Sequence, residues 1–172
     1  RWTQDPKKLA IIRLNRHQNK MEVLLANAKV GTIVPLYREE NKYYIDESNL
    51  DNLVFLDNGT QFVITSEKSG YMHLYLYDLN GRERQAITKG NFDIIDFYGY
   101  DPVRKLFYYS SYEESPLEKY IYSINEKGLK KKLTPVKGWN EASFSKNFNY
   151  YINVASNTDT PPVTALYNAK GK

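Results

Sequence analysis

The sequence repeats itself at intervals of 45 residues, and this period restricts the folds that the chain can adopt. Three sets of similar residues recur at this spacing: Ser66-Glu67, Ser111-Tyr112 and Ser156-Asn157; Leu76-Tyr77, Ile121-Tyr122 and Leu166-Tyr167; and Phe62, Phe107 and Ile152. A fixed period of this length is typical of proteins built from copies of one small structural unit. The fold is therefore expected to be an array of such units.

Turn signals recur at matching places in each unit. Asn58-Gly59, Pro102-Val103 and Lys146-Asn147 precede one strand, and Asn80-Gly81, Lys127-Gly128 and Lys170-Gly171 follow the next. Asn-Gly is the strongest short hairpin signal, because both central residues of a type I′ turn need a positive φ. No helical period is present, so each unit is predicted to consist of short strands joined by tight turns.

The strands expected from these patterns fall into four groups. They cover residues 9–14, 21–26 and 32–37; then 53–56, 61–66, 73–78 and 84–88; then 93–98, 105–111, 119–124 and 130–134; and finally 141–144, 149–155 and 163–168. Residues 38–52 form a longer polar insertion before the regular repeats begin. Four short strands in 40–45 residues are typical of one blade of a β-propeller.

A β-sandwich is the alternative, and the middle strands distinguish the two folds. Sandwich strands bury one face and alternate apolar with polar residues. Here the strands at 74–77, 106–109 and 120–122 are apolar or aromatic on both faces. Blades stacked face to face cover both sides of such strands, so the pattern favours a propeller.

The length predicts a partial propeller. The 172 residues divided by 45 give about 3.8 units, whereas closed propellers have about 4–8 blades. We expect an all-β fold of three to four antiparallel four-stranded blades whose ring is not closed. As one propeller fragment, 1–172, it would comprise a divergent blade with the insertion (1–52) and blade-like repeats at 53–90, 91–138 and 139–172. Exposed blade flanks would then permit self-association.

Composition excludes several classes of protein. The chain has no cysteine, so it has no disulfide, catalytic thiolate or cysteine-bound metal. Its net charge of +4 is spread along the sequence and does not favour a nucleic-acid surface, and no apolar run is long enough to span a membrane. The 16 tyrosines suit strands. The start at Arg1-Trp2 without methionine indicates a fragment, with a processed N-terminus as the alternative.

No catalytic constellation is found. A G-x-S-x-G nucleophile elbow is absent. His73 lies in an expected strand and is predicted to be structural, and His17 is predicted to lie in an exposed turn. Glu39-Glu40 and Glu113-Glu114 are predicted to be solvated loop charges, because neighbours on an extended strand point to opposite sides. Lys130-Lys131-Lys132 is predicted to protect a sheet edge from pairing. We expect no catalytic residue, metal or cofactor.

Several stretches, in order and over nearly the whole chain, resemble the N-terminal propeller region of dipeptidyl peptidase IV-like enzymes, in particular their bacterial branch. They are Leu14 to Asn19, Ser66 to Tyr77, Ile87 to Asp96, Tyr108 to Glu118, Ser143-Phe144-Ser145 and Tyr150-Tyr151. The resemblance implies a serine exopeptidase of the prolyl oligopeptidase group, which releases X-Pro or X-Ala dipeptides. In this group an eight-bladed propeller caps a C-terminal α/β-hydrolase domain that holds the catalytic triad.

The resemblance therefore implies that this chain is a noncatalytic segment of an enzyme. In the parent it would gate and help to position peptides, with the remaining blades and the hydrolase domain as partners and an extracytoplasmic location. The family's amine-binding glutamate pair does not match Glu39-Glu40 or Glu113-Glu114, and its substrate-lining Arg and Phe are missing around residues 43–49. Substrate-binding residues stay unknown. A stand-alone propeller that binds proteins is the alternative function, and a nucleic-acid binder is a weaker one.

Overall fold

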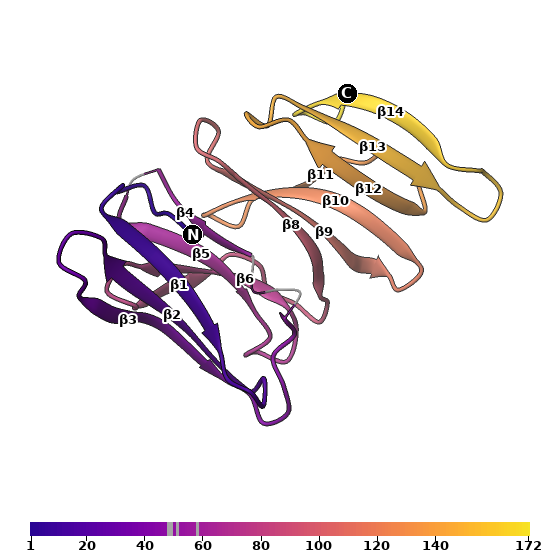
Figure 1. Ribbon diagram of the computed structural model, residues 1–172. Helices are drawn as coiled ribbons and strands as arrows, with labels where there is room; N and C mark the ends of the chain where they lie inside the picture. The colour runs from indigo at the N-terminus through magenta and orange to yellow at the C-terminus, as the bar shows by residue number, and fades with distance from the viewer. Residues whose placement is uncertain (48–49, 51, 58) are drawn as a thin grey trace. The chain divides into compact units, whose positions relative to one another are not determined.

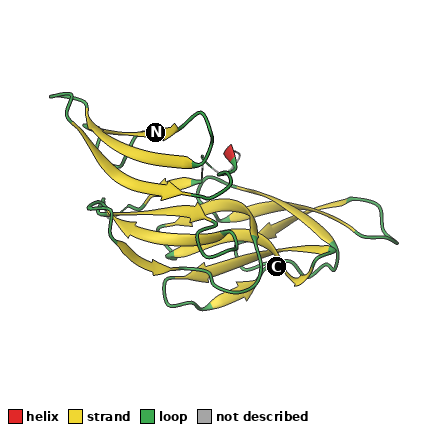
Figure 2. Cartoon of the chain, turned by 90° about the horizontal axis from the view of Figure 1, so that it is seen from below, coloured by secondary structure: helices red, strands yellow, loops and turns green. Residues whose placement is uncertain are grey.

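The computed structural model describes residues 1–47, 50, 52–57 and 59–172, and the regular elements of these residues are fourteen β-strands (Figures 1 and 2). Their bounds are β1 (Lys8–Leu14), β2 (Lys20–Asn27), β3 (Ile33–Glu40), β4 (Leu53–Phe55), β5 (Gln61–Ser66), β6 (His73–Asp78), β7 (Glu83–Ala86), β8 (Ile94–Asp101), β9 (Leu106–Ser115), β10 (Glu118–Asn125), β11 (Lys130–Lys132), β12 (Trp139–Phe144), β13 (Tyr150–Ser156) and β14 (Val163–Asn168). The all-β prediction is confirmed, and each expected strand corresponds to one observed strand.

The chain forms two compact units. The first comprises Arg1–Gly70 and Leu74–Ala86. It contains the sheets β1-β2-β3 and β4-β5-β6-β7, whose neighbouring strands are consecutive in the chain. The core of this unit is apolar and aromatic, and Val23, Leu53 and Phe62 are fully buried in it.

The second unit comprises Tyr71–His73 and Ile87–Lys172. Its strands follow the order β14-β13-β12-β10-β9-β8, with β11 paired to the other part of β10. All of these pairings are antiparallel except that of β10 with β12, which is parallel and consists of the single pair Lys119↔Trp139. Tyr108 and Ile121 from the first part of the unit are buried with Tyr151 from the last part.

The internal repeat is visible in three identical turns. Asp78, Asn125 and Asn168 each accept hydrogen bonds at the side-chain Oδ1 from the backbone N–H groups two and four residues later, at 2.9–3.1 Å. The glycine three residues later has φ of 77°, 79° and 75° in turn, at Gly81, Gly128 and Gly171, so the turns lie where they are predicted. Asn80 does not have a positive φ, so the turn at Asn80-Gly81 is not the type I′ turn that this pair of residues favours. The turn residues are 125 − 78 = 47 and 168 − 125 = 43 residues apart. Of the other predicted turn signals, Asn58 lies outside the described residues.

The uniform 45-residue alignment is wrong in the last repeat. It matches Ile152 with Phe62 and Phe107, which are fully buried, but Ile152 is 47% exposed. Tyr151 is the buried residue of β13, with 1% exposure, and it pairs with Tyr167. A shift of one residue moves a strand's side chains to the opposite face, so the uniform alignment places the wrong face of β13 in the core.

The prediction of strands covered on both faces is confirmed for the middle strands. Every residue of β6 is buried, as are all but the first residue of β5. In β9 and β10 the central residues are buried on both faces. By contrast, β13 alternates between buried and exposed residues, so one face of the sheet β12–β14 is open to solvent.

Candidate functional site

The two histidines lie where the sequence places them. His73 is buried, and its Nδ1 lies 3.1 Å from Thr88 Oγ1 while its Nε2 lies 3.0 Å from the Gly90 carbonyl oxygen. Because a carbonyl only accepts hydrogen bonds, Nε2 carries the proton and Nδ1 accepts from the Thr88 hydroxyl. Both ring nitrogens of His73 are thus used in structural hydrogen bonds, as predicted. His17 lies in the exposed turn between β1 and β2.

The acidic pairs depart from the prediction of solvated loop charges. Glu39 is buried while Glu40 is exposed and pairs with Lys20 at 3.1 Å, so these neighbours do point to opposite sides. The Glu113 side chain is only 9% exposed and forms an ion pair with Lys130. Glu114 pairs with Lys132 at 2.8 Å, and the hydrogen bond from Lys132 lowers the pKa of its carboxyl.

Glu113 and Glu114 also act on one common residue, contrary to prediction. Tyr122 donates a hydrogen bond to Glu114 Oε1 at 2.9 Å. Burial, followed by the effects of both carboxylates, raises the pKa of the Tyr122 phenol. A register shift between Glu118 and Tyr120 in the β9–β10 ladder accompanies this departure from simple alternation.

The three lysines at 130–132 form β11, an edge strand that pairs only with β10 among the described strands. Their position at an edge is as predicted, and exposed lysines there discourage pairing with another chain. Lys130 and Lys132 have an additional role, because they neutralise Glu113 and Glu114. The run is therefore part of an ion-pair cluster.

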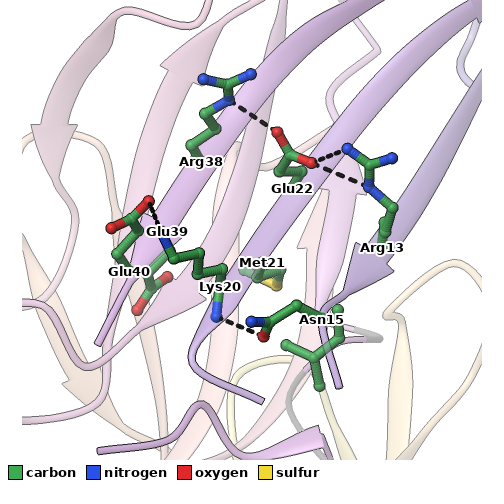
Figure 3. A pocket seen from close by; sticks show the side chains of 9 residues that line it. Arg13, Asn15, Lys20, Met21, Glu22, Arg38, Glu39 and Glu40 are labelled. Atoms are coloured by element: carbon green, nitrogen blue, oxygen red, sulfur yellow. Dashed lines mark hydrogen bonds and ion pairs between the residues drawn. The ribbon is translucent and has the colours of Figure 1, made fainter. Parts of the chain in front are cut away.

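A charged hollow of about 330 Å³ lies at the end of the sheet β1–β3, beside the β1–β2 hairpin (Figure 3). We call it the hairpin hollow, and it is lined by Arg13, Leu14, Asn15, Lys20, Met21, Glu22, Arg38, Glu39 and Glu40. Three basic and three acidic side chains thus surround one polar concavity. Its position follows from the hairpin, because the end of β1, the start of β2 and the end of β3 meet there.

A row of alternating charge crosses the hairpin hollow. Arg13 of β1 lies directly opposite Glu22 of β2, and Glu22 lies directly opposite Arg38 of β3. Arg13 Nε donates to Glu22 Oε2 at 3.0 Å, and Arg38 Nε lies 2.9 Å from Glu22 Oε1 (Figure 3). The hydrogen bond from Arg13, together with the charges of both guanidinium groups, holds the pKa of the Glu22 carboxyl below its ordinary value.

A second carboxylate, that of Glu39, lies on the buried face of the sheet behind the hairpin hollow. Glu39 accepts hydrogen bonds from the Tyr37 hydroxyl at 2.6 Å and from Ser66 Oγ at 2.9 Å. Tyr37 packs edge-on against Tyr77, whose hydroxyl accepts a hydrogen bond of 2.6 Å from Lys68 Nζ. Burial, and then the Glu39 charge, raises the pKa of Tyr37. Glu39 is therefore fixed by hydrogen bonds from within the first unit.

The hairpin hollow has the chemistry of a binding site. Its lining residues include no serine, cysteine or histidine that could act as a nucleophile or general base. Within the part of the chain that the structure describes, no group of three or more His, Asp or Glu residues could hold a metal ion. Charged and hydrogen-bonding groups around a small concavity can bind and orient a polar ligand.

Sequence reasoning missed the row Arg13, Glu22 and Arg38. Its residues are nine and sixteen positions apart and match no motif. A signal was nevertheless present, because consecutive strands of alternating residues place opposite charges across from one another once the hairpin register is known. That register depends on loop lengths and on an irregularity between Val23 and Leu24, which the pattern alone does not reveal.

Comparison with known proteins identifies the family. The sequence model described as "Dipeptidyl peptidase IV (DPP IV) N-terminal region" matches residues 1–162. The chain belongs to this family. The crystal structure of Porphyromonas gingivalis dipeptidyl peptidase 4 superposes with a TM-score of 0.92 at 38% sequence identity, covering 99% of this chain and 24% of that one. The resemblance to the propeller region of DPP IV-like enzymes and the prediction of a partial propeller are thereby confirmed.

Fungal relatives agree with this assignment. The chain is 29% identical over 173 residues to dipeptidyl peptidase 4 of Arthroderma otae, covering 92% of this chain and 21% of the relative. It is 30% identical over 132 residues to dipeptidyl peptidase 4 of Trichophyton rubrum, covering 70% of this chain and 17% of the relative. The chain thus spans about a fifth of these relatives' length. Because the relatives are both bacterial and fungal, a bacterial origin stays a prediction.

Among the residues placed by the structure, there is no helix with the length and apolar character needed to cross a bilayer.

Proposed function

We propose that this chain is a noncatalytic propeller segment of a DPP IV-like serine exopeptidase, in which it gates and helps to position peptides. The observation that carries the proposal is the family match over residues 1–162. The active-site serine, histidine and aspartate would lie in a separate α/β-hydrolase domain. The proposed organisation is a divergent blade at 1–52 and blades at 53–90, 91–138 and 139–172.

The segment's contribution to rate would come from positioning. A peptide held in a fixed orientation has already lost translational and rotational entropy on binding, so this loss no longer adds to the barrier of the chemical step. Enclosure also excludes water from the reacting bond. The parent would release X-Pro or X-Ala dipeptides from peptides in an extracytoplasmic compartment.

Two measurements test this proposal. The purified 172-residue chain should not hydrolyse a Gly-Pro chromogenic substrate, whereas the complete peptidase should. Turnover by the chain itself would contradict a noncatalytic role. The reading frame of the natural gene should continue into a domain with a G-x-S-x-G elbow. A frame that ends close to Lys172 would instead favour the stand-alone protein-binding propeller.

Location can be tested separately. Fractionation of the source cells should place the parent protein outside the cytoplasm. Recovery only with cytoplasmic markers would overturn that part of the proposal.

A further inference from the structure

The Arg13–Glu22–Arg38 row has hydrogen-bonding capacity that the protein does not use. Glu22 occupies Nε and one Nη of Arg13, and only Nε of Arg38. For the residues that the structure describes, the other Nη of Arg13 and both Nη groups of Arg38 have no protein partner. The arginine side chains are 64% and 68% exposed, while that of Glu22 is 19% exposed. The unused N–H groups are therefore available to a ligand.

The row also has a net positive charge. Two guanidinium groups share one carboxylate, so the row carries 2 − 1 = +1. The neighbouring Lys20 is neutralised by Glu40 at 3.1 Å. The remaining carboxylate of the lining, Glu39, points to the opposite, buried face of the sheet, where it accepts from Tyr37 and Ser66. An anion that approaches the exposed face would thus be attracted to the arginines. A guanidinium presents its N–H groups in a planar fork that matches a carboxylate, which makes the carboxylate a suitable anion.

Glu22 restricts both arginines at once. It lies between them in the ladder, accepts hydrogen bonds from Arg13 and forms an ion pair with Arg38, so the two guanidinium groups converge on it (Figure 3). Long arginine side chains otherwise lose considerable rotamer freedom when they bind. A shared carboxylate removes part of that freedom before the ligand arrives, which strengthens binding through preorganisation.

The size of the site limits the ligand. A volume of about 330 Å³ is near the lower end of ligand pockets, which span roughly 300–1,000 Å³. It accommodates one acidic side chain with adjoining backbone.

We propose that Arg13 and Arg38, oriented by Glu22, form a binding site for a carboxylate of an acidic peptide segment. Glu22 acts as a positioning residue, and the two arginines make the contacts. The site belongs to the sheet β1–β3 and needs no catalytic domain, so it extends beyond the peptidase role.

Binding of a labelled peptide to the 172-residue chain tests the proposal. Fluorescence anisotropy would compare a short peptide containing Asp and Glu with its Asn and Gln counterpart at constant ionic strength. The acidic peptide should bind at least about tenfold more tightly than the amide peptide, since charge-assisted bonds are the stronger ones. Arg38→Gln should weaken its binding about tenfold. The matched control is Arg16→Gln, which removes an exposed arginine of the same hairpin outside the hairpin hollow.

Two conservative variants separate an oriented site from general attraction. Arg38→Lys keeps the charge but loses the fork, so binding should still weaken several-fold. Glu22→Gln raises the net charge, so binding should weaken if orientation matters and strengthen if only charge matters. Circular dichroism would verify that both variants are folded, and Glu22→Asp would replace Glu22→Gln if the latter unfolds.

The overturning results are specific. Equal effects of Arg38→Gln and Arg16→Gln, or stronger binding by the Glu22 variant, would overturn the oriented site. Displacement of the peptide by inorganic phosphate at lower concentration than by free acidic peptide would overturn the peptide assignment. Peptidase activity is not part of the readout, so failure here is distinguishable from failure of the proposed function.

Discussion

Lys68 in the first unit and Glu113 in the second occupy equivalent positions in their sheets and carry opposite charges. They are 113 − 68 = 45 residues apart, just beyond the buried part of β5 and near the end of β9. Lys68 pairs with Glu83, and Glu113 pairs with Lys130. Glu83 and Lys130 each lie five residues after the first residue of the repeated turn. The same ion pair therefore recurs with its charges reversed.

Because the charges are reversed in the second unit, we expect the first unit to tolerate exchange of its own two charges. Glu83→Lys would set two ammonium groups against each other and should destabilise the chain by about 1 kcal/mol, the upper end for an exposed pair. Adding Lys68→Glu restores opposite charges and should recover about half of the loss. The recovery is incomplete because Lys68 also lies 3.9 Å from the centre of the Tyr75 ring. Urea denaturation would measure both changes, and a double variant no more stable than the single one would contradict the pairing.

Gly81 should tolerate substitution less well than Gly128, although both occupy the same turn position with nearly equal φ. A Cβ on Gly81 would lie 2.5 Å from the Leu36 carbonyl oxygen, whereas a Cβ on Gly128 has nothing within 4 Å. Gly128→Ala should cost about 1 kcal/mol, the penalty of a left-handed conformation. Gly81→Ala should cost at least about 1 kcal/mol more, because backbone must move. Equal shifts in thermal denaturation would show that the close approach is absent.

Buried tyrosines should make the fold sensitive to alkali. Burial raises the pKa of Tyr151 to about 12, with a smaller effect from Tyr167. A raised pKa in the folded state means that this stabilisation is complete below the unfolded value of about 10 and is lost as the pH rises through 12. Tyrosinate absorbance should therefore show a late phase that coincides with loss of circular dichroism.

The variant Tyr151→Phe has one ionisable buried group fewer. Once any change in its stability at neutral pH is allowed for, its late phase should therefore occur at higher pH than that of the unmodified chain. Tyr150→Phe is the control, since Tyr150 is the exposed neighbour on the same strand. If both variants change the late phase equally, burial of Tyr151 is not its cause.

The open face of the sheet β12–β14 should promote self-association. Ile152 and Leu166 pair across β13 and β14 and are both exposed. Replacing both with threonine keeps β propensity and removes apolar surface. Sedimentation should show less association at high concentration, with little loss of stability. Tyr151→Ala, one residue away, should instead cost about 3–5 kcal/mol, as aromatic core truncations do. Unchanged association of the double threonine variant would exclude this face.

The sequence was most informative where apolar strands lie between clear turn signals. The ranges 61–66, 73–78 and 163–168 coincide with β5, β6 and β14. Apolar residues on both faces specify β5 and β6 locally, and β14 ends at the turn that contains Gly171. The exposed position of Ile152 was not predictable, because a uniform period cannot reveal that the repeats differ in length.

The candidate site was far less predictable than the strands. The Arg13–Glu22–Arg38 row exists only through the pairing of three strands, and that pairing includes an irregularity between Val23 and Leu24. Glu113 and Glu114 depart from simple alternation near another register shift. Local patterns describe a strand by itself, whereas side-chain clusters depend on how strands are aligned with one another.

The single backbone pair between β10 and β12 has a consequence for how the second unit opens. Among the described residues, Lys119↔Trp139 is the only strand pair that joins the ladder β8–β11 to the ladder β12–β14, so separating them breaks far less backbone hydrogen bonding than unravelling either one. The Asn140 side chain donates hydrogen bonds to the Lys119 and Gly138 carbonyls and so stabilises the junction between the two ladders. Amide protons of the last three strands should therefore exchange with deuterium together, as one cooperative block, while those of β9 and β10 remain protected.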